Sequence, residues 1–295
     1  MRVNSLFRRM LLKISSLGNN GQYVYVDEYE YTPKSRNSLE KSRIGEIFNK
    51  WYTDNTEKTV DLFTKFCSFK QNYEKIPFES TSNETPKWVN RFLSPLDAIS
   101  LYGFIATRNP RYYVEVGSGN TTLIAAQSIR DNNLRTKIIS IDPQPRRGID
   151  KLCHKIYRVP LENMDNTFFN TLSNEDLLLI DDSHRCFPNS DVTVFFTEIL
   201  PTLPPGLLYA IHDIVLPNDY PEEWSVKEKR WYNEQYLLCA YLLGGAGRGG
   251  DTIKCPTAFL SNKKEVTKAC DTLWGKGELF EGKEWGGCLF WIEKT

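Results

Sequence analysis

The sequence predicts an α/β protein: a doubly wound, mostly parallel sheet of seven strands with an antiparallel edge, plus a helical N-terminal extension. Two observations predict it. Between residues 112 and 211, short β-branched runs alternate with helix-compatible segments, which is the rhythm of parallel strands joined by helical crossovers. After that region, two more apolar runs are separated by one helical segment, and such a pair can add an antiparallel edge.

The first 93 residues are predicted to be an extension in front of the sheet. Residues 38–69 place large apolar side chains at spacings of three and four, as an amphipathic helix does, whereas residues 23–32 alternate like a strand. A second helix is expected over 94–107, because a serine can cap its first turn and a proline follows. We therefore divide the chain into an extension, 1–93, that could serve as a lid or an oligomerisation arm, and a domain, 94–295.

Inside this domain the elements follow one another in a regular order. The core of the predicted sheet consists of strand 112–116, helix 120–131, strand 137–141, helix 146–153, strand 155–159, helix 163–172, strand 177–181, helix 190–201 and strand 206–211. The predicted edge follows as helix 230–243, strand 253–260, helix 263–273 and strand 287–293.

Composition excludes several classes of protein. Among 295 residues, 37 Lys and Arg balance 37 Asp and Glu, so no net field favours a nucleic-acid partner. The seven cysteines form no Cys-x-x-Cys pair, which argues against a disulfide framework or zinc ribbon and favours a reducing, cytoplasmic compartment. No stretch is long and apolar enough to span a membrane.

The stretch "YYVEVGSGNTT" (112–122) predicts a strand, a tight glycine turn and the start of a helix. Gly117 and Gly119 allow backbone N–H groups to approach a ligand at the helix N-terminus. A dinucleotide fingerprint needs a third glycine where Thr122 stands, so an NAD-dependent oxidoreductase is disfavoured. Asp142, which closes the next strand, is well placed to bind the two hydroxyls of a ribose.

Polar residues stand at the end of every predicted parallel strand. In an open α/β sheet, ligands bind at the carboxyl ends of the strands. In chain order, these ends carry Glu115, Gly117, Gly119, Asp142, Glu162, Asp181, Asp182, His184, His212 and Asp213. Two of the three histidines of the chain are among them, so we expect one shared site.

The motifs "EVGSGNTT", "ISIDPQP", "LLLIDDSH" and "GLLYAIHDIVLPNDYP" together resemble a class I S-adenosylmethionine-dependent methyltransferase of the small-molecule O-methyltransferase-like group. The resemblance covers about residues 88–295. It implies a Rossmann-like fold and S-adenosyl-L-methionine as cofactor. Carried over by position, the cofactor-binding residues are Glu115, Gly117, Ser118, Gly119, Asn120, Asp142, Glu162 and Asp181.

Metal-dependent relatives of this kind place an acid after the fourth strand and an acidic pair after the fifth around Mg²⁺. Asp182, His184 and His212 are the implied catalytic residues, and Asp182, His212 and Asp213 are the implied metal ligands. His212 departs from the pattern because imidazole is a poor ligand for Mg²⁺. Two explanations stay open: a softer divalent metal, or no metal and a histidine as general base.

The leading hypothesis is methylation of a hydroxyl group on a small molecule or glycan. A catalytically silent methyltransferase-like module that binds a partner is the alternative from another class. A nucleic-acid methyltransferase is disfavoured, because neither Asn-Pro-Pro-Tyr nor Asp-Pro-Pro-Tyr follows the fourth strand. The sequence leaves open the acceptor, the attacked atom, the metal and whether the chain forms a homo-oligomer.

Overall fold

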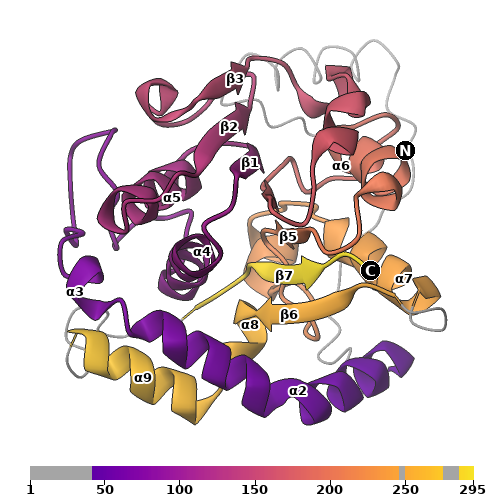
Figure 1. Ribbon diagram of the computed structural model, residues 1–295. Helices are drawn as coiled ribbons and strands as arrows, with labels where there is room; N and C mark the ends of the chain where they lie inside the picture. Colours follow the sequence, from indigo (N-terminus) through magenta and orange to yellow (C-terminus); the bar gives the residue numbers. More distant parts are fainter. Residues whose placement is uncertain (1–41, 246–249, 275–285) are drawn as a thin grey trace. The chain divides into compact units, whose positions relative to one another are not determined.

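The computed structural model describes residues 42–245, 250–274 and 286–295 (Figure 1). Within them, one sheet has the strand order β3-β2-β1-β4-β5-β7-β6. Strands β1 to β5 pair in parallel, and β7 runs antiparallel to both β5 and β6. The predicted fold class is therefore confirmed. The strands are β1 (Tyr112–Val116), β2 (Lys137–Ile141), β3 (Lys155–Tyr157), β4 (Leu177–Ile180), β5 (Leu208–Ile211), β6 (Thr252–Pro256) and β7 (Phe290–Glu293).

Helices cover both faces of the sheet, so its central strands are buried on both sides. In β4, Leu177 and Leu179 pack into one hydrophobic cluster, and Leu178 and Ile180 into another. Because both faces of such a parallel strand are buried, its sequence is a continuous apolar run without polar alternation. The α-helices are α2 (Arg43–Cys67), α3 (Lys70–Tyr73), α4 (Pro95–Arg108), α5 (Asn120–Asp131), α6 (Asp191–Val194), α7 (Glu234–Gly245), α8 (Thr257–Leu260) and α9 (Lys264–Trp274).

The helices expected over 38–69 and 94–107 are present as α2 and α4. The Ser94 side chain accepts a hydrogen bond from the Asp97 N–H and caps α4, which ends at Asn109 in the left-handed conformation. In Figure 1, α2 runs beside α9, and the two helices pack against each other. The strand expected over 23–32 lies outside the described residues, and the domain boundary after residue 93 stays a prediction.

Two predicted crossover helices are only 3₁₀ turns. The segment predicted as helix 146–153 forms a single turn, Asp150–Leu152, after a stretch interrupted by prolines and Gly148. The segment predicted as helix 163–172 is mostly the turn Asn166–Thr171. There the Asp165 side chain accepts from the Thr167 N–H, and such a local bond competes with helical pairing.

Other elements start or stop at different residues from those predicted. Strand β6 gives way at Thr257 to α8, and β7 begins only at Phe290. The backbone N–H groups of Cys288 and Leu289 donate to the Asp97 carboxylate instead of to a neighbouring strand. The helix predicted at 190–201 continues from α6 as a π-helical turn, Phe195–Ile199, and a 3₁₀ turn. The helix predicted at 230–243 begins at Glu234.

This topology brings the carboxyl ends of β1, β2, β4 and β5 to one edge of the sheet. The order reverses between β1 and β4, and ligands of doubly wound sheets bind at that reversal. Over the described part of the chain, no helix combines the length and apolar character needed to cross a bilayer.

Candidate active site

The glycine turn after β1 is held tightly against the end of β4. Gly117 has a φ of +76°, and a Cβ built on it would lie 1.8 Å from the carbonyl oxygen of Asp181. Only glycine fits both this conformation and this close approach. The turn thus positions the N-terminus of α5 at the sheet edge.

Glu115, expected to bind the cofactor, lies beneath this turn and is fully buried. Its carboxylate accepts a 2.7 Å hydrogen bond from the Tyr113 hydroxyl and a second from the Thr122 hydroxyl. Burial raises the pKa of Glu115 to about 7, although these hydrogen bonds partly offset the rise. Thr122 also accepts from the Gly119 N–H, so the residue that replaces the third glycine ties the turn to the strand.

Asp142, at the end of β2, contacts the same turn. One carboxylate oxygen accepts from the Ser118 N–H at 2.7 Å, and the other accepts from the Gln144 N–H at 2.7 Å. Each oxygen keeps a second lone pair for a further donor. Glu162, the other acid expected near the cofactor, is exposed in a 3₁₀ turn and does not line the pocket described next.

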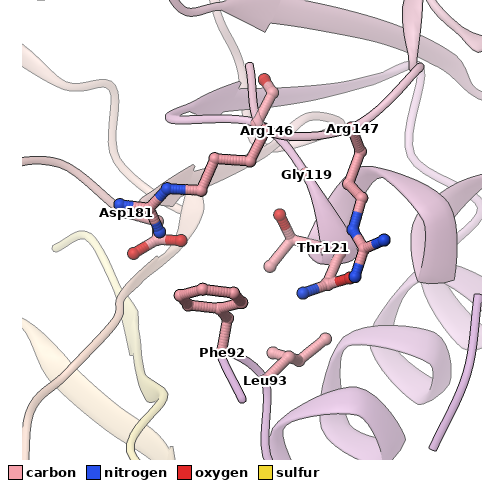
Figure 2. Close-up of a pocket in the computed structure, with 9 residues that line it drawn as sticks. Phe92, Leu93, Gly119, Thr121, Arg146, Arg147 and Asp181 are labelled. Atoms are coloured by element: carbon pink, nitrogen blue, oxygen red, sulfur yellow. The ribbon is translucent and has the colours of Figure 1, made fainter. Parts of the chain in front are cut away.

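A pocket opens over the glycine turn and the start of α5 (Figure 2). Its lining includes four of the residues expected at the cofactor site: Ser118, Gly119, Asn120 and Asp181. The remaining lining residues were not anticipated from the sequence: Phe92, Leu93, Thr121, Arg146 and Arg147. The Arg146 guanidinium lies 5.0 Å from the centre of the Phe92 ring, so a cation–π contact closes one side of the pocket. Apart from Thr121, which stands inside the glycine-turn motif, no sequence motif marked these side chains, because they come from loops outside the glycine turn.

Behind Asp181 lies a buried cluster of two imidazoles and several carboxylates. Asp181 Oδ1 is 3.2 Å from His212 Nδ1 and 3.4 Å from His184 Nε2. The two carboxylate oxygens of Asp213 lie 3.4 Å from His184 Nε2 and 3.5 Å from His212 Nδ1. The side chains of both histidines are only 5–6% exposed, whereas that of Asp181 is 31% exposed. The structure thus brings together the residues expected from the ends of β4 and β5.

Three further residues that the sequence did not flag as part of this cluster surround the imidazoles. Glu234, at the start of α7, lies 2.9 Å from His184 Nδ1. Cys288 Sγ and Asp97 Oδ2 lie 3.4 Å and 3.8 Å from His212 Nε2. These residues come from segments far apart in the chain, and no local motif connects them.

Asp182, expected to be catalytic, turns away from the centre of this cluster. Its Oδ1 atom accepts from the His184 N–H at 2.9 Å and lies 3.6 Å from the outer nitrogen, Nδ1, of that ring. Burial, followed by the nearby charge of Glu234, raises the pKa of Asp182 well above its ordinary value. Asp181, and not Asp182, is the carboxylate that faces both imidazoles and the pocket.

The charges of this cluster determine its protonation. Burial alone would lower the pKa of both histidines, but the surrounding acidic groups outweigh it and raise both well above the ordinary value. For Asp181, burial alone would raise the pKa, but His212 and His184 together hold it well below the ordinary value. The cluster therefore favours positive charge at its centre, carried by protons or by a cation.

The comparisons with known proteins agree with this architecture. Residues 114–214 match the family model described as a methyltransferase domain. The resemblance seen in the strand-end motifs is thereby confirmed. No curated protein sequence matches the chain.

The chain also shows a distant similarity to solved structures of methyltransferases. The O-methyltransferase TomG from Streptomyces achromogenes, involved in tomaymycin synthesis and solved with S-adenosylmethionine (SAM), is 12% identical with a TM-score of 0.42 over 77% of this chain and 96% of its own. An O-methyltransferase from Bacillus cereus with bound S-adenosylhomocysteine (SAH) is 11% identical, with a TM-score of 0.39 over 85% and 100%. MycE of the mycinamycin pathway, solved with Mg and SAH, is 20% identical, with a TM-score of 0.33 over 49% and 41%. Because the identities and TM-scores are this low, the ligands of these proteins are not transferred to this chain.

Proposed function

We propose that the chain is a SAM-dependent methyltransferase that methylates a hydroxyl oxygen of a small molecule or glycan. The observation that carries the proposal is the position of Asp181, which lines the pocket over the glycine turn and also contacts both buried imidazoles. Methyl transfer requires the acceptor oxygen in line with the sulfonium methyl group, and a nearby group to take the acceptor's proton. The pocket and the cluster offer adjoining places for the two reactants.

The pocket and Asp142, which contacts the same glycine turn without lining the pocket, carry complementary groups for the methyl donor. The lone pairs that Asp142 retains would accept hydrogen bonds from two ribose hydroxyls. The N-terminus of α5 and the guanidinium groups of Arg146 and Arg147 would attract the carboxylate of the methionine part. The donor would thus lie along the turn with its reactive end toward Asp181.

The acceptor would approach from the segment between β5 and α7. The Tyr232 ring lies 4.6 Å from the His184 ring, and Trp224 and Tyr220 pack against it. Trp231 is 46% exposed beside them. The accessible rings, Trp224, Trp231 and Tyr232, would hold a sugar or other planar group by stacking, with its hydroxyl toward the carboxylate and imidazole cluster that takes the proton.

Magnesium, the ion expected by resemblance to metal-dependent relatives, does not fit the donor atoms present. Two of the atoms that face the centre of the cluster are imidazole nitrogens of His184 and His212. Magnesium prefers an octahedron of oxygen ligands and keeps several waters. The proposed transfer therefore assigns no role to Mg²⁺.

Calorimetric titration of the purified chain with SAM, SAH and NAD tests this proposal. We expect SAM and SAH to bind and NAD not to bind. Asp142→Ala should weaken SAM binding about tenfold, the loss of roughly 1.4 kcal/mol for hydrogen bonds to a charged group. Glu175→Gln, an exposed acid at the opposite end of the parallel strands, is the matched control and should bind SAM as the wild type does.

The other outcomes each point elsewhere. Binding of NAD alone would replace methyl transfer with redox chemistry. If none of the three ligands binds, the chain is a partner-binding module with a methyltransferase fold. If Asp142→Ala binds SAM with unchanged affinity, Asp142 does not hold the ribose.

A further inference from the structure

We propose that Asp181, His184, His212 and Asp213 form a binding site for a divalent transition-metal ion of the zinc class. The four side chains come from the loops that follow β4 and β5, and the carboxylates of Asp181 and Asp213 each contact both histidines. The site depends only on these side chains. The role that we give its ion, positioning the acceptor hydroxyl, rests on the proposed methyl transfer.

The distances within the cluster match those around a small metal ion. Asp181 Oδ1 lies 3.4 Å from His184 Nε2 and 3.2 Å from His212 Nδ1. Asp213 contacts the same two nitrogens through its two different oxygens, at 3.4 and 3.5 Å. Nitrogen and oxygen ligands bound at about 2.0–2.1 Å to a tetrahedral zinc ion lie about 3.3–3.4 Å from one another. One ligand atom each from Asp181, His184 and His212 also lies within 4.8 Å of the other two.

The outer nitrogen of His184 is held as in a metal-bound histidine. Its Nδ1 atom lies 2.9 Å from Glu234 Oε2, and Glu234 is fully buried. A histidine ligand usually donates its second N–H to a carboxylate, which fixes the tautomer and turns the free nitrogen toward the metal. That contact leaves His184 Nε2 as the atom that faces Asp181 and Asp213.

His212 shows the same arrangement with the opposite nitrogen. Its Nε2 atom faces Cys288 Sγ at 3.4 Å, so Nδ1 points toward Asp181 and Asp213. His212 Nδ1 is buried and makes no hydrogen bond. An unsatisfied buried nitrogen is costly, and Asp181 Oδ1 lies only 3.2 Å from it, so a cation held between the two atoms would satisfy both.

The donor set selects a class of metal. Imidazole nitrogens suit zinc and its transition-metal neighbours, whereas Mg²⁺ prefers oxygen ligands. Asp181 is partly exposed and lines the pocket proposed for the methyl donor. The Tyr232 ring, on the proposed acceptor side, lies 4.6 Å from the His184 ring, so an ion bound by this cluster would adjoin both reactants. Asp97 and Cys288 face the outer nitrogen of His212, which places them outside the four ligands.

Metal binding is measured on the purified full chain, stripped with a chelator and titrated with Zn²⁺, Co²⁺ and Mg²⁺. We expect one Zn²⁺ or Co²⁺ per chain by elemental analysis and no displacement by a large excess of Mg²⁺. The bound Co²⁺ should show the absorption of a four-coordinate site without a thiolate charge-transfer band. Since no methyl transfer is involved, this result is independent of whether SAM binds.

Variants locate the site. His184→Gln and His212→Gln should each lose stoichiometric binding, and Glu234→Gln should bind 10–100-fold more weakly. His154→Gln, which removes the third, exposed histidine, and Cys288→Ser are controls that should keep one ion per chain. If a histidine variant does not give a wild-type circular dichroism spectrum, Asp181→Asn is used in its place.

Three outcomes would overturn the proposal. The first is the absence of stoichiometric binding by the wild-type chain. The second is equal competition by Mg²⁺, which would make the site an oxygen-ligand site. The third is loss of the ion in Cys288→Ser with retention in His184→Gln, which would move the site to Asp97, His212 and Cys288.

Discussion

At the scale of single residues, Glu115 shows how a sequence motif can contain a structural residue. Its place beside the glycine turn suggested cofactor binding, whereas both of its oxygens accept hydrogen bonds from Tyr113 and Thr122 in the interior. No solvent reaches it. Its carboxyl group therefore connects β1 to α5, and any effect on cofactor binding would act through the turn.

The raised pKa of Glu115 predicts a stability difference that depends on pH. Its pKa rises from 4.5 to about 7 on folding, so the native state holds an extra proton between these values. The wild-type chain then loses up to about 3 kcal/mol of stability from this group as pH rises through that range. Glu115→Gln lacks the titration, so its free energy of unfolding relative to wild type should increase by about 2–3 kcal/mol from pH 5 to pH 8.

Urea unfolding of both chains at the two pH values measures this difference. The difference in free energy of unfolding between the two chains cancels the contributions of the other titrating groups. Glu175→Gln, which removes an exposed acid, is the control and should show no such change. If the wild-type and Glu115→Gln curves stay parallel from pH 5 to pH 8, Glu115 is ionised in the native state.

Arg147 provides a second prediction at this scale. Arg147 lines the pocket at the N-terminus of α5, where a guanidinium favours a carboxylate. Arg147→Ala should weaken SAM binding roughly tenfold, the effect of losing about 1.4 kcal/mol, but leave 5′-methylthioadenosine, which has no carboxylate, unaffected. Calorimetry with both ligands measures this, and Arg135→Ala at the opposite end of the sheet is the control. Equal weakening of the two ligands would mean that Arg147 shapes the pocket without contacting the carboxylate.

At the scale of elements, the contact between α2 and α4 depends on one glycine. Gly103 lies in the middle of α4, and a Cβ built on it would approach the Phe66 ring of α2 to 2.2 Å. The centre of the Phe66 ring lies 4.8 Å from the centre of the Phe104 ring, and Phe66 is fully buried. The missing side chain of Gly103 thus lets the two helices pack closely.

Gly103→Ala should therefore destabilise the chain despite the better helix propensity of alanine. Overpacking a buried site costs about 1–3 kcal/mol, and the propensity gain returns at most about 1 kcal/mol. Adding Phe66→Leu should recover part of the loss, which a double-mutant cycle in urea measures. Gly244→Ala in α7, where a Cβ meets no atom within 4 Å, is the matched control and should not destabilise. Strictly additive losses would show that Gly103 does not serve the Phe66 contact.

The sequence predicted elements well where a local pattern determines them. Strands β1 and β2 have the predicted bounds, because β-branched runs end at a glycine turn and an aspartate. The predictions were wrong where a distant residue takes over the backbone hydrogen bonds. Cys288 and Leu289 read as part of a strand, yet their N–H groups donate to Asp97, nearly 200 residues earlier in the chain.

At the scale of the whole molecule, the same distinction applies to the candidate site. The ends of β4 and β5 were expected to meet because adjacent parallel strands end at one edge, and they bring His184 and His212 together. The orienting residue Glu234 could not be predicted, because it reaches the cluster from α7. In the sequence, Glu234 resembles any acidic residue in the first turn of a helix.

Asp97 connects these distant parts, and its removal should weaken the whole fold. Its buried carboxylate accepts from the Leu289 N–H at 2.8 Å, the Cys288 N–H at 2.9 Å and the Thr257 hydroxyl at 2.5 Å. Asp97→Ala leaves the Cys288 N–H without its acceptor and leaves Thr257 and Leu289 with only their bonds to each other, so a loss of about 3 kcal/mol is expected. Asp97→Asn keeps one acceptor oxygen and should lose less. Since α4 and β7 both line the central core, circular dichroism and the fluorescence contribution of buried Trp291, taken as the difference from a Trp291→Phe chain, should report one shared transition. If that contribution instead shows an earlier transition than circular dichroism, the antiparallel edge unfolds separately and Asp97 stabilises only that edge.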